Sequence, residues 1–174
     1  MHAAQPLPQP DLESRVFADH HQALKLWLRL LSCTTRVEGV VRSRLRSEFG
    51  TTLPRFDLLA QLERHPKGLT MSELSQRLMV TGGSVTGITD QLEAEGLVLR
   101  AAHPADRRAY SVRLTAVGRR QFKRMAAIHE QWIVELFAGW SSGQKTQVQA
   151  LLATLKQHLA SFEVQPKTRK DKHP

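Results

Sequence analysis

Apolar residues recur at intervals of three and four along most of this chain, and that spacing places them on one face of an α-helix. The first run extends from about residue 19 to residue 49 and predicts one long amphipathic helix. Its apolar positions are Leu24, Trp27, Leu28, Leu31, Val37, Val41 and Leu45. A second, shorter helix is predicted over residues 54–65, because Pro54 suits the first helical position and Pro66 and Gly68 follow the helix.

Two short helices follow, each with its own start signal. Thr70 and Glu73 have the spacing of a reciprocal capping box, which predicts a helix that breaks at residues 79–80. Thr81 then caps a further helix that ends at Gly96. Two short helices joined by a tight turn form a helix-turn-helix unit.

The pattern changes to that of β-structure after this unit. Residues 97–100 and 110–114 are rich in β-prone side chains, and the second run alternates apolar and polar positions. A turn-rich segment at 103–106 lies between them. The two runs therefore predict a β-hairpin with a basic tip that carries Arg107 and Arg108.

Helical spacing returns at Thr115, which is placed to cap a last long helical region. Two apolar stripes follow, separated by a break at residues 141–143. The first comprises Met125, Ile128, Trp132, Leu136 and Trp140, and the second comprises Val148, Leu151, Leu152, Leu155, Leu159 and Phe162. This is more apolar surface than one small domain needs, which favours packing against a second copy of the chain; the alternative is that both stripes are core.

The charge of the chain is strongly basic and clustered. Among 174 residues, 25 Lys and Arg outnumber 16 Asp and Glu, which gives a net charge of +9. The excess cations lie in residues 25–46 and 100–124, whereas residues 47–96 are mildly acidic. Such patches suit a polyanion, namely nucleic acid, an anionic membrane surface or an acidic protein; a solvated basic surface is the alternative.

Several classes of protein are disfavoured by the composition. No stretch approaches the ~18 consecutive apolar residues of a membrane span, and residues 1–15 do not resemble a secretory signal, so we expect a cytoplasmic protein. Cys33 is the single cysteine and is expected to be a packed structural thiol, with a redox-sensing thiol as the alternative. The histidines show no zinc-ligand spacing, and no nucleophile–base pair is recognisable. We therefore expect no metal, no cofactor and no enzymatic activity.

The helix that Thr81 caps has an outer face of small and polar residues. This face comprises Gly83, Thr86, Gly87, Asp90 and Gln91, opposite Val85, Ile88 and Leu92. A helix that enters the major groove of DNA needs short side chains on its outer face, and its N-terminus favours phosphates. The expected DNA contacts on this helix are Thr81, Gly83, Ser84, Thr86, Gly87 and Gln91, with Ser84 and Thr86 as the best readers. A weak, solvent-exposed helix is the alternative.

The hairpin tip is expected to contact the minor groove of DNA, where a narrow groove attracts an arginine. Arg107 and Arg108 are the candidates, and a solvated turn is the alternative. Asp90 and Asp106 would repel phosphates if they were unpaired. We therefore expect one of these carboxylates to pair with Arg107 or Arg108 and to orient its guanidinium group.

The run from residue 69 to residue 118 resembles the winged helix-turn-helix core of the MarR family, the multiple-antibiotic-resistance regulators. Its most specific parts are the sequence DRR at 106–108, the sequence LTAVG at 114–118 and the sequence DQLEAEGLV at 90–98. The resemblance extends over roughly residues 20–162. It implies a homodimer of interlocking terminal helices, with two recognition helices in successive major grooves of a pseudo-palindrome and wing arginines in the minor grooves. Gly82 and Gly83 depart from the family pattern, where proline or a hydroxyl residue is common.

The fold expected from these features is mainly α-helical with a small β-hairpin wing, a winged helix-turn-helix with N- and C-terminal dimerisation helices. The expected segments are a mobile N-terminal segment (1–18), a first dimerisation and ligand-pocket helix (19–50), a DNA-binding lobe (51–116), C-terminal dimerisation helices (117–163) and a basic mobile tail (164–174).

The resemblance also implies a small effector, aromatic or anionic, bound between the dimer helices and the DNA-binding lobe. Arg42 and Arg46 share a helix face, and with Arg36 they suit a carboxylate or phosphate. The expected apolar walls are Trp27, Phe56 and Trp132. We expect an aromatic carboxylate or its coenzyme A thioester, as in regulators of aromatic-compound breakdown; the alternative is that these arginines face DNA or solvent.

The sequence thus predicts a dimeric, DNA-binding transcriptional regulator, a repressor that a small ligand releases from its operator. The alternative is an architectural DNA-binding dimer without sequence preference, or a protein-binding dimer, neither having an effector. Sequence preference separates these functions, because a regulator discriminates its operator from random DNA by ~10³ or more.

Overall fold

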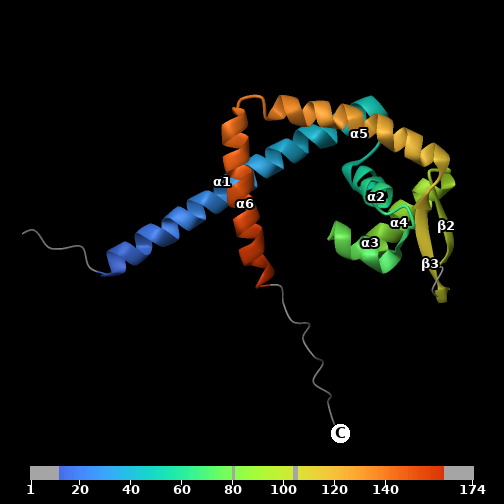
Figure 1. The fold of residues 1–174 in the computed structure, drawn as a ribbon, viewed down its shortest axis with the longest axis horizontal. Helices are drawn as coiled ribbons and strands as arrows, with labels where there is room; N and C mark the ends of the chain where they lie inside the picture. The colour runs from blue at the N-terminus through green and yellow to red at the C-terminus, as the bar shows by residue number, and fades with distance from the viewer. Residues whose placement is uncertain (1–11, 80, 104–105, 163–174) are drawn as a thin grey trace, which may run out of the picture. The chain divides into compact units, whose positions relative to one another are not determined.

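The computed structural model describes residues 12–79, 81–103 and 106–162, and the side chains of 21–79, 81–101 and 110–162 among them. The chain divides into two compact units, residues 1–132 and 133–174. The elements (Figure 1) are α1 (Leu12–Phe49), α2 (Leu53–Arg64), β1 (Leu69–Thr70), α3 (Met71–Leu78), α4 (Gly82–Ala94), β2 (Val98–His103), β3 (Asp106–Leu114), α5 (Ala116–Leu136) and α6 (Ser142–Ala160). The predicted fold class, mainly helical with a small winged hairpin, is confirmed.

The predicted caps place the two helices of the helix-turn-helix. Thr70 Oγ1 accepts a hydrogen bond from the Glu73 backbone N–H at 3.2 Å, and the Glu73 carboxylate accepts one from the Thr70 backbone N–H at 2.7 Å. The capping box predicted at the start of α3 is therefore confirmed. Thr81 Oγ1 accepts from the Ser84 backbone N–H at 3.5 Å and caps α4. Between the helices, Met79 has a left-handed backbone with φ of 52°.

The three strands form one antiparallel sheet in the order β1-β3-β2. The hairpin pairs Val98 with Leu114, and its strands extend further toward the tip than the sequence pattern indicated. The short strand β1, which the sequence pattern did not indicate, pairs Leu69 with Val112. Gly68 precedes β1 with φ of +95°, a conformation that favours glycine.

The core of the first unit lies where α2, α3 and α4 pack beside the hairpin, as Figure 1 shows. Apolar side chains from every one of these elements are buried there. Fully buried members include Leu58, Leu59 and Leu62 of α2, Leu74 of α3, Val85 and Leu92 of α4, Val98 of β2 and Val112 of β3. This core supports α4 from one side, so the opposite side of α4 stays at the surface.

Thr115 links the wing to α5. Its hydroxyl donates to the Gly96 carbonyl at 2.7 Å and accepts from the Gly118 backbone N–H at 2.9 Å. The cap predicted at Thr115 is therefore confirmed, and it also ties α5 to the turn that follows α4.

The second unit contains the end of α5 and the whole of α6. The sequence pattern continued the first apolar stripe to Trp140, but α5 ends at Leu136 and Trp140 lies in the turn before Ser141. A capping box starts α6, in which Ser141 Oγ accepts from the Gln144 backbone N–H at 3.3 Å. The cap stabilises a new helix start here, and the segment between the helices is therefore not part of the apolar stripe.

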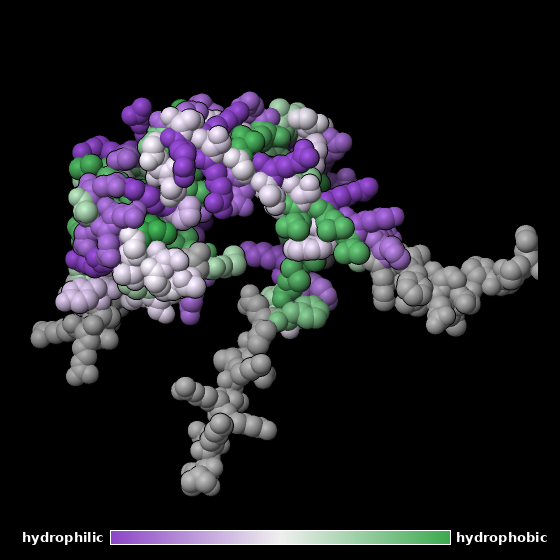
Figure 2. Space-filling view, turned by 180° about the vertical axis from the view of Figure 1, so that it is seen from behind, coloured by the Kyte–Doolittle hydropathy of each residue, from purple (hydrophilic) through white to green (hydrophobic). Residues whose placement is uncertain are grey.

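The apolar stripe of α6 is not a core. None of its residues is buried, and Leu151 and Leu159 are 64% and 53% exposed. Figure 2 shows hydrophobic atoms, in green, at the surface of α6. The described part of α1 also exposes apolar side chains, at Leu24, Leu26, Trp27, Leu28 and Leu31. No helix in the described ranges is both long and apolar enough to cross a membrane.

Candidate DNA-binding surface and adjoining pocket

The outer face of α4 is exposed along its whole length, as the helical periodicity predicted. Val85 and Leu92 point into the core and are fully buried. The predicted DNA-contacting residues of this region are all exposed: Thr81, Gly83, Ser84, Thr86, Gly87 and Gln91. The structure therefore brings them together on one surface, next to the N-terminus of α4, which carries a partial positive charge.

Short side chains and backbone make up most of this face. A Cβ added at Gly82, Gly83 or Gly87 would meet no neighbouring atom within 4 Å, apart from the backbone of the helix itself. The Ser84 hydroxyl lies 2.9 Å from the Thr81 hydroxyl, and the Thr86 hydroxyl donates to the Gly82 carbonyl at 3.0 Å. The helix can thus approach another surface closely, with its hydroxyls held in place by the first turn.

The wing lies beside α4, and its basic tip belongs to β3. The backbones of Arg107 and Arg108 are part of that strand. Their side chains and that of Asp106 lie outside the described side chains, so their contacts, including the predicted pairing of Asp106, stay a prediction.

Asp90 has a different partner from the two arginines that the sequence suggested. Its carboxylate lies 2.5 Å from a terminal nitrogen of Arg100, which also binds Glu93. Asp90 therefore contacts a wing arginine, but one at the base of β2, because the wing begins only a few residues after α4. Arg100 was not among the residues predicted from the sequence. Two acids three positions apart on a helix, followed a few residues later by a strand that carries an arginine, are the signal that indicates it.

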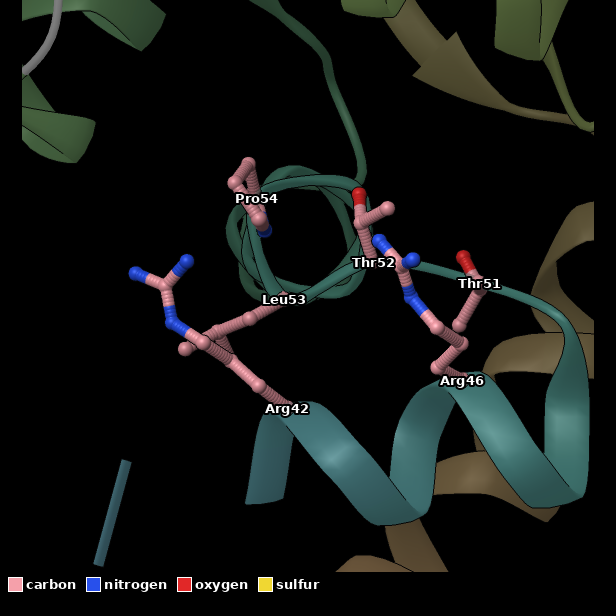
Figure 3. Close-up of a pocket in the computed structure, with 6 residues that line it drawn as sticks. All are labelled: Arg42, Arg46, Thr51, Thr52, Leu53 and Pro54. Atoms are coloured by element: carbon pink, nitrogen blue, oxygen red, sulfur yellow. The ribbon is translucent and has the colours of Figure 1, made fainter. Parts of the chain in front are cut away.

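A pocket of about 260 Å³ lies between the end of α1 and the start of α2. Figure 3 shows Arg42 and Arg46 projecting from α1 toward the residues that begin α2. The remaining lining residues are Thr51, Thr52, Leu53 and Pro54. Two guanidinium groups beside threonine side chains suit an anion. Arg42 also binds Glu38, whereas Arg46 has no carboxylate partner within the described residues.

A second pocket, of about 220 Å³, shares Arg42, Leu53 and Pro54 with the first. It adds the acids Glu38 and Asp57 and the apolar side chains Leu78 and Ile88. Burial raises the pKa of the Asp57 carboxyl, the Glu38 carboxylate raises it further, and Arg42 opposes both. The basic pocket therefore adjoins a more acidic one that reaches α3 and α4.

The other predicted ligand residues do not line either pocket. Phe56 and Trp132, expected as open walls, are buried in an aromatic cluster that Phe49, Phe122 and His129 complete. Trp27 and Arg36 are exposed on α1. In this single chain, Phe56 and Trp132 fill the space between α1, α2 and α5 rather than line an open pocket. The expectation that these four residues surround a ligand with Arg42 and Arg46 stays a prediction.

The surroundings of Cys33 and His129 add to what the sequence indicated. Cys33 is exposed, which corrects the expectation of a packed thiol. His129 lies 4.9 Å from Phe56, ring centre to ring centre, and burial lowers its pKa. Across the described residues no cluster of three or more His, Cys, Asp or Glu side chains is arranged to hold a metal ion.

Comparisons with known proteins identify the family. The MarR family model matches residues 49–109. A helix-turn-helix transcriptional repressor from Mycobacterium tuberculosis is 32% identical over 123 residues, 69% of this chain and 88% of that repressor. A MarR family transcriptional regulator from Silicibacter pomeroyi is 31% identical, with a TM-score of 0.70 over 81% of this chain and 97% of that one.

A more distant structure shares the fold. BpsR from Bordetella bronchiseptica, whose DNA binding is regulated by 6-hydroxynicotinic acid, is 22% identical, with a TM-score of 0.63 over 73% of this chain and 89% of that one. These relatives are regulators rather than enzymes. With its exposed α4 and adjacent wing, this chain belongs to the MarR family of transcriptional regulators.

Proposed function

We propose that this protein is a sequence-specific repressor that binds a pseudo-palindromic operator through α4 and the wing. The observation that carries the proposal is the outer face of α4, which is exposed, has short side chains and is backed by a buried apolar core. Such a face fits the major groove, where Thr86 and Gln91 reach base edges. Arg107 and Arg108 of the wing enter the flanking minor groove. The relative from Mycobacterium tuberculosis is a repressor by name, which supports repression rather than activation.

The active form in this proposal is a homodimer. The exposed apolar side chains of α6 and of the described part of α1 form more apolar surface than a monomer usually leaves in water. A second copy would cover them and would place two α4 helices on one side of the DNA. Two-fold symmetry of the protein then requires a two-fold, pseudo-palindromic operator.

The effector in this proposal is a small aromatic anion, an aromatic carboxylate or its coenzyme A thioester. Arg42 and Arg46 supply the cationic side of the pocket, and Leu53 and Pro54 supply apolar contact. The related fold of BpsR responds to 6-hydroxynicotinic acid, itself an aromatic carboxylate. The adjoining pocket reaches Leu78 of α3 and Ile88 of α4, so an occupant there would touch both helices of the DNA-binding unit. Such contacts supply the differential binding that release from DNA requires.

One observation favours a second function, an architectural DNA-binding dimer. Gly82, Gly83 and Gly87 offer no side chain, and the hydroxyls of Ser84 and Thr86 already have partners within the helix. Gln91 then has the longest uncharged side chain on the outer face for contacting base edges. A protein with so few side chains that contact base edges would depend on phosphate contacts and would bind many DNA sequences with similar affinity.

Selection of duplexes from a randomised pool by the purified protein distinguishes the two functions. A repressor enriches a two-fold motif, and fluorescence anisotropy at fixed salt then shows ~10³-fold preference for that duplex over a scrambled one. Arg108→Ala and Thr86→Ala are expected to weaken this binding while the dimer stays intact. Enrichment of no motif, with equal binding to both duplexes, would establish the architectural function instead.

A further inference from the structure

Arg100 joins the wing to the recognition helix through three contacts. Its guanidinium group lies 2.5 Å from the Asp90 carboxylate and also binds the Glu93 carboxylate. Its backbone N–H donates a further hydrogen bond to Glu93 at 3.0 Å. Asp90 and Glu93 are three positions apart on α4, so one arginine of β2 binds successive turns of the helix. The Arg100 side chain is 28% exposed, whereas those of Asp90 and Glu93 are 57% and 37% exposed, so the contact lies at the surface with its arginine partly covered.

The position of these contacts matters because Asp90 lies on the same exposed side of α4 as Gly87 and Gln91. An uncompensated carboxylate there would repel the phosphates of an approaching duplex. Arg100 is ionised at every accessible pH, since the hydrogen bond to Asp90, opposed in part by burial, raises its already high pKa. One permanent positive charge therefore lies between two carboxylates at the edge of the DNA-binding face.

Two other ion pairs among the described residues have a different arrangement. Arg55 of α2 binds Glu95 at the end of α4, and Arg119 of α5 lies 3.0 Å from Glu63 of α2. Each of these pairs joins one cation to one carboxylate, and neither involves the wing. They provide matched controls, because breaking either one removes an ion pair that does not connect α4 to the hairpin.

We propose that Arg100 is a positioning residue for DNA binding, which holds the wing at a defined angle to α4 and shields the Asp90 carboxylate from phosphate. This inference rests on the proposed DNA-binding face. Because both ends of the guanidinium group bind carboxylates, Arg100 acts through Asp90 and Glu93 rather than by contacting phosphate itself. The angle it maintains determines whether α4 and the wing tip reach adjacent grooves together.

A double-mutant cycle tests the proposal on the duplex that the parent protein selects. Arg100→Gln is expected to weaken binding by about tenfold or more, because it unpairs both carboxylates and frees the wing. Adding Asp90→Asn to Arg100→Gln is expected to restore a large part of that loss, since the exposed negative charge disappears while Glu93 keeps the backbone N–H of residue 100. The single variant Asp90→Asn completes the cycle and is expected to change binding little, because Arg100 already shields that carboxylate. If Asp90→Asn strengthens binding by the same factor in the parent and in Arg100→Gln, the two residues are not coupled, and the proposal is wrong.

Hydrogen exchange supplies a readout that does not depend on DNA. In Arg100→Gln, amides of β2 are expected to exchange faster than in the parent, because the wing has lost its connection to α4. The control Arg55→Gln is expected to lower stability but to leave both β2 exchange and duplex affinity near the parent values. If the parent binds no duplex, the proposed function and the positioning role both fail. If the parent binds and Arg100→Gln binds equally well, only the positioning role fails.

Discussion

Gly118, in the first turn of α5, lies directly against the backbone carbonyl of Leu97. A Cβ added at residue 118 would be 1.9 Å from the Leu97 oxygen, a distance that real Cβ atoms do not adopt. The obstacle is backbone rather than a flexible side chain, so the strand or the helix would have to move. The glycine that ends the sequence LTAVG is thus required for α5 to begin immediately beside the strand that leads into the wing.

We expect Gly118→Ala to lower the free energy of unfolding by about 3 kcal/mol, measured by urea denaturation, because the clash displaces the start of α5. Gly82→Ala is the matched control, since a Cβ there meets open space. Alanine in a helix is favoured over glycine by up to ~1 kcal/mol, so this control is expected to be as stable as the parent or more stable. Equal stabilities for Gly118→Ala and the parent would contradict the tight packing.

The space around Gly87 is open, so a substitution there tests DNA binding without disturbing the fold. Gly87→Leu is expected to fold at least as stably as the parent, because leucine favours the helix over glycine and a Cβ at residue 87 meets open space. It is expected to lose binding to the selected duplex by about 100-fold, since the side chain holds α4 away from the groove. Gln121→Leu, at an exposed position of α5, is the control and is expected to bind like the parent. Duplex binding by Gly87→Leu at the affinity of the parent would show that this face of α4 does not contact DNA.

Arg46 provides a test of the pocket. Arg46→Ala is expected to weaken binding of 6-hydroxynicotinate or benzoate by about tenfold, measured by calorimetry, because a charge-assisted contact is lost. Release of DNA by these acids would weaken in parallel. Arg36→Ala is the control, because Arg36 does not line the pocket. Equal ligand affinity in Arg46→Ala and the parent would show that the anion binds elsewhere.

His129 makes stability depend on pH with a defined sign. Burial lowers its pKa in the folded protein, so the unfolded chain binds the proton more readily. The stability associated with neutral His129 is present above the unfolded pKa of about 6.5 and is lost as the pH falls through the folded value. His129→Phe keeps an aromatic ring beside Phe56, and its Tm is expected to fall less than that of the parent between about pH 7.5 and pH 5. Parallel Tm profiles would contradict this.

The apolar stripe of α6 tests the dimer. Leu155 and Leu159 lie on one helix face and are exposed in the single chain, so replacing both with Asp is expected to leave the helix content unchanged. Burial of those carboxylates in a dimer would be costly, and sedimentation velocity is expected to show monomers. The control Gln149→Asp changes an exposed polar position of the same helix. A dimeric double variant would show that α6 lies outside the interface.

Much of the fold could be predicted because helix starts and ends depend on nearby residues. Thr70, Thr81 and Thr115 cap the helices that their positions indicated, since a cap needs only a hydroxyl within reach of the next turn. The strand β1 escaped prediction because two residues carry no periodicity, and only pairing with β3 makes them a strand. Trp140 was misplaced because apolar spacing alone does not show where a helix ends.

By itself, the sequence determined which face of α4 is free, because helical periodicity is local geometry and places Gly83, Gly87 and Gln91 opposite the core. It also indicated the family, through short motifs. Only the tertiary structure decided which partners meet: Arg100 for Asp90, and the aromatic cluster for Phe56 and Trp132. Such contacts depend on the angles and distances at which separate elements pack, and those follow from the filling of the whole core rather than from the spacing of residues along the chain.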